Sequence, residues 1–293
     1  MAVQVAGARA HRSPRAISPK RPRIGVVKLA SCDGCQLTLL DLEDELLAIS
    51  QRVDIVEFAE ATSRRSAGPF DVLFVEGSVS TPEQAEEIAR LRAVSQILVT
   101  IGACATAGGI QAIRNWFDHD DIRAAVYPQP GYVESLAQAR PVADFVAVDA
   151  ELRGCPISPG QLREFLVALT TGRRPQLPDE AVCIECKRRG VVCVAVAQGI
   201  ACLGPVTRTG CGAICPAYGR GCYGCFGPRE AANTTSLATW LGDRRSAADV
   251  GRLFAGFTAW SPPFRSVIDA GGGPPGPVGR RSANPASPEA TDA

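Results

Sequence analysis

Residues 24–36 read IGVVKLASCDGCQ, and the order of features in this stretch recurs along the first half of the chain. Ile24–Leu29 is apolar and follows a proline-rich arm, which predicts a first buried strand. The loop Ser31–Cys35 comes next and carries two cysteines. Gln36–Ser50 mixes leucines with acidic residues near its start, as an amphipathic helix would. The stretch therefore predicts a strand, a cysteine-bearing loop and a helix, in that order.

Further strands and helices alternate after it. Apolar runs predict strands at Val53–Phe58, Asp71–Glu76, Gln96–Ile101 and Val142–Val148. Helices are expected from Thr81 to about Ala93 and from Ser158 to Thr171, with Ser158 as N-cap and Gly172 after the end. Because strands alternate with helices, we expect the α/β fold class, with a mostly parallel sheet covered on both faces.

Four cysteines come directly after expected strands. Cys32 and Cys35 follow the first strand, Cys104 follows Gln96–Ile101 in a glycine-flanked loop, and Cys155 follows the strand expected at Val142–Val148. The carboxyl ends of parallel strands meet at one edge of a sheet, where ligands bind in such folds. The sequence therefore predicts that these four thiols converge, although they lie far apart along the chain.

Eight more cysteines crowd into one later segment. They are Cys183, Cys186, Cys193, Cys202, Cys211, Cys215, Cys222 and Cys225. The segment has many glycines and little periodicity, so we expect that it builds no hydrophobic core and needs inorganic clusters to organise it. A short helical stretch is expected from Thr235 to about Phe254.

These features predict four regions in the chain. Residues 1–23 form a disordered basic arm, and residues 24–178 form the α/β domain. Residues 179–260 form the cysteine-rich domain. Residues 261–293 are rich in Gly, Pro, Ser and Ala and are expected to form a disordered tail.

Composition narrows the use of the cysteines. The chain has 31 Lys and Arg against 30 Asp and Glu, which gives no reason to expect nucleic acid or an anionic membrane surface as a partner. No apolar run is long enough to span a bilayer, and the arm lacks the apolar core of an export signal. We therefore expect a cytoplasmic protein with reduced thiols. Twelve cysteines then favour metal ligation, and three sets of four suit three [4Fe–4S] clusters and electron transfer.

Two other uses of the cysteines compete with this one. A redox dithiol at Cys32 and Cys35 would leave the other ten without a role. The pairs Cys183–Cys186 and Cys222–Cys225 would suit zinc, and their spacing does not exclude a structural zinc domain. A Ser-His-Asp or Cys-His nucleophile is hard to assemble, because His11 and His119 are the only histidines.

Four motifs resemble those of the small subunits of [NiFe] hydrogenases, and most closely the delta subunit of cytosolic NAD(P)-linked hydrogenases, also called sulfhydrogenases. They are Ser31-Cys32-Asp33-Gly34-Cys35-Gln36, Gly102–Gly109, Gly154-Cys155-Pro156, and the run from Cys202-Leu203-Gly204-Pro205 to Cys225-Phe226-Gly227-Pro228. The resemblance extends from about Ile24 to about Phe257. It implies a flavodoxin-like first domain and an irregular C-terminal iron–sulfur domain.

The resemblance also implies a ligand set for each of three [4Fe–4S] clusters. The proximal set is Cys32, Cys35, Cys104 and Cys155. Taken in sequence order, the distal set is Cys183, Cys186, Cys193 and Cys202, and the medial set is Cys211, Cys215, Cys222 and Cys225. An interleaved partition of these eight stays open.

This chain departs from many exported relatives at two positions. Cys183 stands where those relatives have a histidine ligand, and Cys215 stands where many have a proline beside a three-iron cluster. Both changes suggest four-iron clusters at low potential, which suits exchange of electrons with NAD(P)H.

In this family the Ni–Fe centre belongs to a separate large subunit, so the chain would hold no catalytic residue and would relay electrons. The implied partners are the [NiFe] large subunit and the iron–sulfur and FAD/NAD(P)-binding diaphorase subunits, with sulfur or polysulfide as a further acceptor. The alternative is the cluster-bearing subunit of a quinone-reducing respiratory complex, which shares the N-terminal fold.

Glu76 ends the strand expected at Asp71–Glu76 and resembles an acidic position near the proximal cluster. A proton path through Glu76 is one hypothesis. The interpretation that we favour is a carboxylate that accepts backbone amides.

Overall fold

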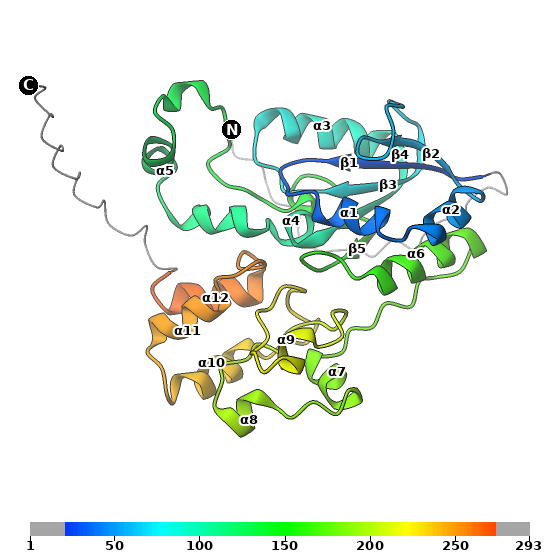
Figure 1. Ribbon diagram of the computed structural model, residues 1–293. Coiled ribbons are helices and arrows are strands. Elements are labelled where there is room, and N and C mark those ends of the chain that lie inside the picture. Colours follow the sequence, from blue (N-terminus) through cyan, green and yellow to red (C-terminus); the bar gives the residue numbers. More distant parts are fainter. Residues whose placement is uncertain (1–20, 274–293) are drawn as a thin grey trace, which may run out of the picture.

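The chain folds around one parallel sheet (Figure 1). The structure is a computed structural model, and it describes residues 21–273. Within these residues the strand order is β2-β1-β3-β4-β5, and each neighbouring pair is parallel. The strands are β1 Arg23–Lys28, β2 Asp54–Phe58, β3 Phe70–Glu76, β4 Ser95–Ile101 and β5 Ala150–Leu152. The predicted α/β fold with a mostly parallel sheet is confirmed.

The central strands are apolar because helices cover the sheet on both faces. Phe74 of β3 packs edge to face on Phe165 of α6 (Pro159–Thr171), with ring centroids 5.7 Å apart. Leu73 points to the other face and packs in the cluster that contains Ile88 of α3 (Pro82–Ala93). Burial on both faces explains why β3 is a nearly continuous apolar run rather than an alternating one.

The helices and turns around the sheet mostly match the expected positions. They are α1 Gly34–Leu40, α2 Asp44–Ser50, α3, α4 Gly102–Ala107, α5 His119–Val126 and α6, with 3-10 turns η1 Ile110–Trp116, η2 Pro130–Tyr132 and η3 Val142–Asp144. The single helix expected over Gln36–Ser50 is two, because Glu43 takes a φ of 47° outside the helical region. Ser158 caps α6 and Gly172 ends it, as predicted.

The strand expected at Val142–Val148 is wrong. Residues 142–144 form η3, and pairing with β4 begins only at β5, where Ala150 faces Val99. Val142 and Val146 pack into the apolar layer beneath α3, so their hydrophobicity reflects burial rather than a strand. The side-chain carboxylate of Asp149 accepts the backbone N–H of Leu98 in β4 at 2.8 Å. A side chain thus takes the hydrogen bond that the backbone carbonyl of a neighbouring strand would otherwise accept. β5 still ends just before Cys155.

The second half of the chain consists of short helices and loops beside the sheet (Figure 1). The helices are α7 Val182–Arg188, α8 Val194–Gln198, α9 Ile214–Ala217, α10 Thr234–Gly242, α11 Ala247–Phe254 and α12 Pro262–Ala270. The stretch expected from Thr235 to about Phe254 is thus two helices, α10 and α11. Among the helices of residues 21–273, none is long and apolar enough to cross a membrane.

The second half has an apolar core, contrary to expectation. Leu203 and Val206 from the cysteine-rich segment pack with Leu241, Phe254 and Phe264 from the helices that follow it. The segment supplies only a few apolar side chains, and α10, α11 and α12 supply the rest. Apolar packing therefore contributes to the organisation of this half.

The expected disordered tail is wrong for residues 262–270, which form α12. Phe264, Val267 and Ile268 fall at helical spacing and are buried. The ring of Phe264 lies edge to face with that of Phe254, with centroids 5.2 Å apart. The composition of the tail hid this short amphipathic stretch. The remainder of the expected tail, 274–293, and residues 1–20 of the expected arm lie outside the described residues.

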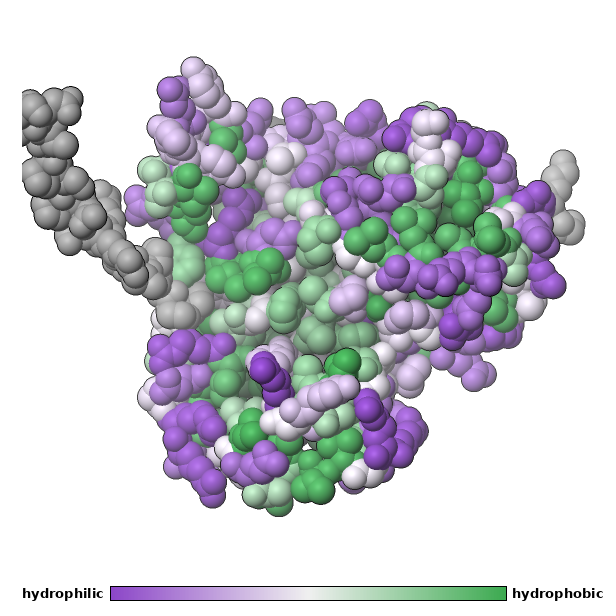
Figure 2. Space-filling view, in the orientation of Figure 1, coloured by the Kyte–Doolittle hydropathy of each residue, from purple (hydrophilic) through white to green (hydrophobic). Residues whose placement is uncertain are grey.

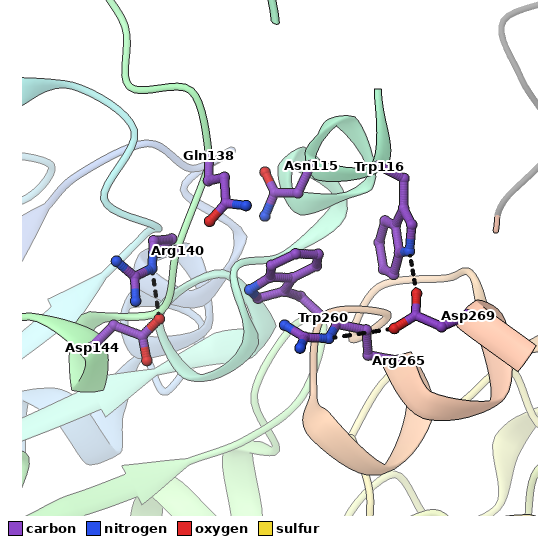
Figure 3. A pocket seen from close by; sticks show the side chains of 8 residues that line it. All are labelled: Asn115, Trp116, Gln138, Arg140, Asp144, Trp260, Arg265 and Asp269. Atoms are coloured by element: carbon purple, nitrogen blue, oxygen red, sulfur yellow. Dashed lines mark hydrogen bonds and ion pairs between the residues drawn. The ribbon is translucent and has the colours of Figure 1, made fainter. Parts of the chain in front are cut away.

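α12 also contacts the first half of the chain, beside a cavity of about 390 Å³ (Figure 3). Trp116 of η1 lies edge to face with Trp260, with centroids 4.9 Å apart, and its indole N–H donates to Asp269 at 2.7 Å. The Arg265 guanidinium stacks over the Trp260 ring at 4.6 Å. These contacts fix the end of the second half against the loop that follows α4.

We expect Phe264→Ala to lower the free energy of unfolding by about 3–5 kcal/mol, because it empties a fully buried aromatic site in the second core. The control Ser266→Ala changes an exposed residue of the same helix and should shift stability by less than about 0.5 kcal/mol. Chemical denaturation under anaerobic conditions measures both. Equal stability of the two variants would show that α12 does not pack as described.

Candidate metal centres

The first four cysteines meet at one edge of the sheet. Cys32 and Cys35 flank the start of α1 just after β1, Cys104 lies in α4 just after β4, and Cys155 follows β5. Burial raises the pKa of Cys104, and the neighbouring thiols of Cys155 and Cys32 add to the rise. Cys104 and Cys155 act on Cys35. The structure therefore brings together all four residues of the expected proximal set.

Two glycines let the backbone pass close to these sulfurs. Gly102 has a φ of +84°, and a Cβ at that position would overlap the Sγ of Cys35. Gly109 has a φ of +69°, and a Cβ there would lie 2.6 Å from the Sγ of Cys104. Both the backbone conformation and the closeness of sulfur require glycine. The backbone thus forms part of a cradle around the thiols.

Three thiols of this set, those of Cys35, Cys104 and Cys155, have raised pKa values, and burial is the largest cause for each. The pKa of Cys104 rises to about 11, mainly through desolvation, and that of Cys35 is also raised, with desolvation as the largest cause and Glu76 as the next. Such thiols keep their protons at neutral pH unless a cation takes the place of the proton. A metal deprotonates its thiol ligands outright, so the chemistry of the set suits a bound metal group.

Glu76 accepts backbone amides, as the favoured interpretation expected. Its side chain is buried at 2% exposure, and its two oxygens accept the N–H groups of Cys35 and Gln36, each at 3.2 Å. Burial raises the pKa of Glu76, while these hydrogen bonds act in the opposite direction. The carboxylate therefore fixes the start of α1 and the cysteine that it carries. A proton path through Glu76 stays a hypothesis.

Gln111 is a neighbour of this set that the sequence analysis did not single out. Its Nε2 donates to the carbonyl of Ala30 at 2.8 Å and lies 3.6 Å from the Sγ of Cys104. This amide joins η1 to the loop after β1, and it directs an N–H toward the Sγ of Cys104. In the sequence, only its position two residues after Gly109 could have indicated that Gln111 lies near the cysteines.

The second set gathers around α7. Cys183 and Cys186 lie one turn apart on α7, Cys193 immediately precedes α8, and Cys202 lies in the loop that follows. Burial raises the pKa of Cys183 to about 11, and Cys202, Cys186 and Cys193 add to the rise in that order. The N–H of Gly204 donates to the Sγ of Cys202 at 3.4 Å. Hydrogen bonds to sulfur of this kind tune iron–sulfur sites.

The third set surrounds α9. Cys211 precedes that helix, Cys215 lies in it, and Cys222 and Cys225 lie in the loop after it. Burial raises the pKa of Cys225 to about 12, with Cys211 and Cys215 among the further causes. Burial also raises the pKa of Cys222, to which Cys225 contributes. The N–H of Gly224 donates to the Sγ of Cys222 at 3.5 Å.

Two contacts order the three sets in space. The N–H of Cys222 donates to the Sγ of Cys202 at 3.2 Å, so the third set adjoins the second. Cys155 is among the causes that raise the pKa of Cys225, so the third set also adjoins the first. The third set therefore adjoins both of the others.

The donors in each place fit an iron–sulfur cube. Each thiolate of a [4Fe–4S] cube binds a different iron, so a cube takes four thiolates. Four thiols, glycine-lined backbone and amides directed at sulfur are the features that such a group uses.

Comparison with known proteins gives a consistent result. Residues 32–169 match the family model described as NADH ubiquinone oxidoreductase, 20 Kd subunit. Sulfhydrogenase 2 subunit delta of Pyrococcus furiosus is 36% identical over 238 residues, which cover 81% of this chain and 100% of that protein. NAD-reducing hydrogenase HoxS subunit delta of Cupriavidus necator is 28% identical over 171 residues, 53% of this chain and 82% of that protein. A chain in the crystal structure of an NAD⁺-reducing [NiFe]-hydrogenase in the H₂-reduced state matches with a TM-score of 0.51 and 30% identity, over 54% of this chain and 96% of that chain.

We expect Gly102→Ala to lower the iron content of the anaerobically purified chain by about four atoms, one cube, because the added Cβ would displace the Sγ of Cys35. Gly172→Ala is the matched control. Gly172 also has a positive φ, +68°, but a Cβ there would meet nothing within 4 Å. Iron analysis of both variants separates backbone strain from the contact with sulfur. Equal iron in both would mean that the close approach of Gly102 is not needed.

Proposed function

This chain belongs to the hydrogenase small-subunit family that includes the sulfhydrogenase delta subunits, and from that premise we propose that it carries electrons within a [NiFe] hydrogenase. One observation supports the proposal above the others. Of the twelve cysteines, all of which lie in the described residues, Cys32 and Cys193 are the exposed ones. They belong to the two outer sets. A chain of redox sites that begins and ends at the surface can receive electrons on one side and release them on another.

We assign one [4Fe–4S] cluster to each set of four cysteines, and these clusters would supply one-electron carriers. The proximal set is Cys32, Cys35, Cys104 and Cys155. The distal set is Cys183, Cys186, Cys193 and Cys202, and the medial set is Cys211, Cys215, Cys222 and Cys225. The partition of the last eight follows their order in the sequence, and the response of the Cys183 thiol to Cys202, Cys186 and Cys193 supports the distal set.

The proximal end is where we place the [NiFe] large subunit. Exposed apolar side chains flank this set: Leu37 on α1 is 49% exposed and Ile110, directly after Gly109, is 58% exposed. Apolar side chains beside an exposed ligand cysteine suit burial by a partner. The partner would carry out hydrogen cleavage, and the role of this chain is to hold the first electron acceptor against it.

The distal end is where we place the next electron carrier, an iron–sulfur or FAD/NAD(P)-binding diaphorase subunit. Val192 and Val196 are 69% and 83% exposed on either side of Cys193. Figure 2 shows apolar side chains at the lower end of the molecule, where Figure 1 places α8. The names of the relatives, NAD-reducing hydrogenase and sulfhydrogenase, support NAD(P)⁺ as acceptor and sulfur or polysulfide as a further one.

We place this activity in the cytoplasm. All twelve cysteines are free thiols, and a reducing compartment is where a chain with this many ligand cysteines avoids disulfide formation. NAD(P)⁺, the proposed final acceptor, also favours this compartment.

The second candidate is a cluster-bearing subunit of a quinone-reducing respiratory complex, and the family match over residues 32–169 favours it. That match ends before the first cysteine of the distal set. The alignment with the sulfhydrogenase subunit covers 81% of the chain, so it necessarily includes the eight-cysteine segment. The hydrogenase assignment therefore accounts for more of the chain.

The tagged chain, purified anaerobically from its native host, tests the proposal. We expect it to bring down a nickel-containing subunit and to reduce a viologen dye with H₂. We expect Ile110→Glu to abolish this association, because it places a charge on the proximal face. Leu47→Glu is the control, since Leu47 is 64% exposed on α2 and lies outside that face. A wild-type preparation without nickel and without H₂-dependent dye reduction would refute the hydrogenase assignment.

A further inference from the structure

We propose that Glu185 positions the medial ligand Cys211 and places a fixed negative charge between the medial and distal sets; this inference rests on the proposed function. Glu185 lies on α7 between Cys183 and Cys186, which belong to the distal set. Its carboxylate does not contact its own set. It reaches across to residues 210–213, the loop that carries Cys211.

The carboxylate makes three contacts with this loop. Its Oε1 accepts the N–H of Gly210 at 3.0 Å, and its Oε2 accepts the N–H of Ala213 at 3.1 Å. Oε2 also lies 3.7 Å from the Sγ of Cys211. The two amides stand on either side of the cysteine. One side chain therefore holds the backbone before and after a medial ligand.

The loop needs this support because its backbone conformation is unfavourable. Gly212 and Ala213 have φ values of +66° and +53°. Glycine adopts this left-handed region readily, so the strain falls on Ala213, which carries a Cβ. Arg189, the residue that directly follows α7, donates to the carbonyl of Gly212 at 2.5 Å. One side chain of α7 and one directly after it thus fix the loop, the first at its amides and the second at its carbonyl.

The charge of Glu185 acts on both sets. The Oε2 of Glu185 lies 3.7 Å from the Sγ of Cys211 in the medial set. Glu185 also directly precedes Cys186 of the distal set on α7. A negative charge beside a site that accepts electrons disfavours its reduced form. Glu185 therefore lowers the reduction potentials of the medial and distal sites relative to the proximal one.

Two substitutions of Glu185 separate its role in positioning Cys211 from the effect of its negative charge. Both are made in the full chain, purified anaerobically with its clusters. Glu185→Gln keeps a hydrogen-bond acceptor and removes the charge. We expect it to retain iron, while the medial and distal paramagnetic signals appear at higher potential and the proximal signal does not move. Glu185→Ala removes both acceptors, and we expect it to lose about four iron atoms, one cube. Glu180→Gln is the control, because Glu180 is 42% exposed and pairs with Arg188.

Each outcome decides one part of the inference. If Glu185→Gln titrates as the wild-type chain does, the role of the charge is wrong. If Glu185→Ala keeps all its iron with an unchanged spectrum, the positioning role is wrong. If the wild-type chain itself shows no iron–sulfur signal, the proposed function fails before the role of Glu185 is reached.

Discussion

The gathering of four thiols, most of them wholly or partly buried, in each of three places is the constraint on which the rest of the structure depends. A thiolate loses its hydration when it is buried, and a neighbouring thiolate repels it, so each effect favours the protonated form. The raised pKa values of Cys104, Cys183 and Cys225 express both effects. Iron in place of the protons, as we propose, would remove this penalty and would use the same closeness for ligation. The chain supplies backbone amides to the sulfurs, as those of Gly204 and Gly224 illustrate.

The two halves of the chain meet this constraint in different ways. In the first half, the parallel sheet brings Cys35 and Cys104 to one edge because β1 and β4 end there, and Glu76 then fixes the backbone of Cys35. In the second half, short helices and left-handed residues hold the cysteines. The core made by α10, α11 and α12 gives that half a rigid base, and the contact of Trp116 with Asp269 attaches the base to the first half.

The sequence was sufficient for the features that depend on local pattern. Alternation of strands and helices predicted the parallel sheet, and the place of Cys32 and Cys104 after strands predicted their common edge. Contacts between distant residues could not be predicted in this way. Glu185 lies between Cys183 and Cys186 in the sequence. Nothing in that neighbourhood indicated that its carboxylate accepts the N–H of Gly210. The apolar pattern of Val142–Val148 led to a wrong prediction of a strand. A non-strand segment that is buried beneath a helix has the same run of apolar residues as a buried strand.

The most direct test of three cubes in these three sets is the location of iron in crystals of the chain grown without oxygen. Diffraction data collected at the iron absorption edge reveal where iron lies among the sulfurs. The account predicts three separate peaks, one within each set of four cysteines, with the medial peak between the other two. Fewer than three iron peaks, or peaks at the zinc edge in their place, would contradict it.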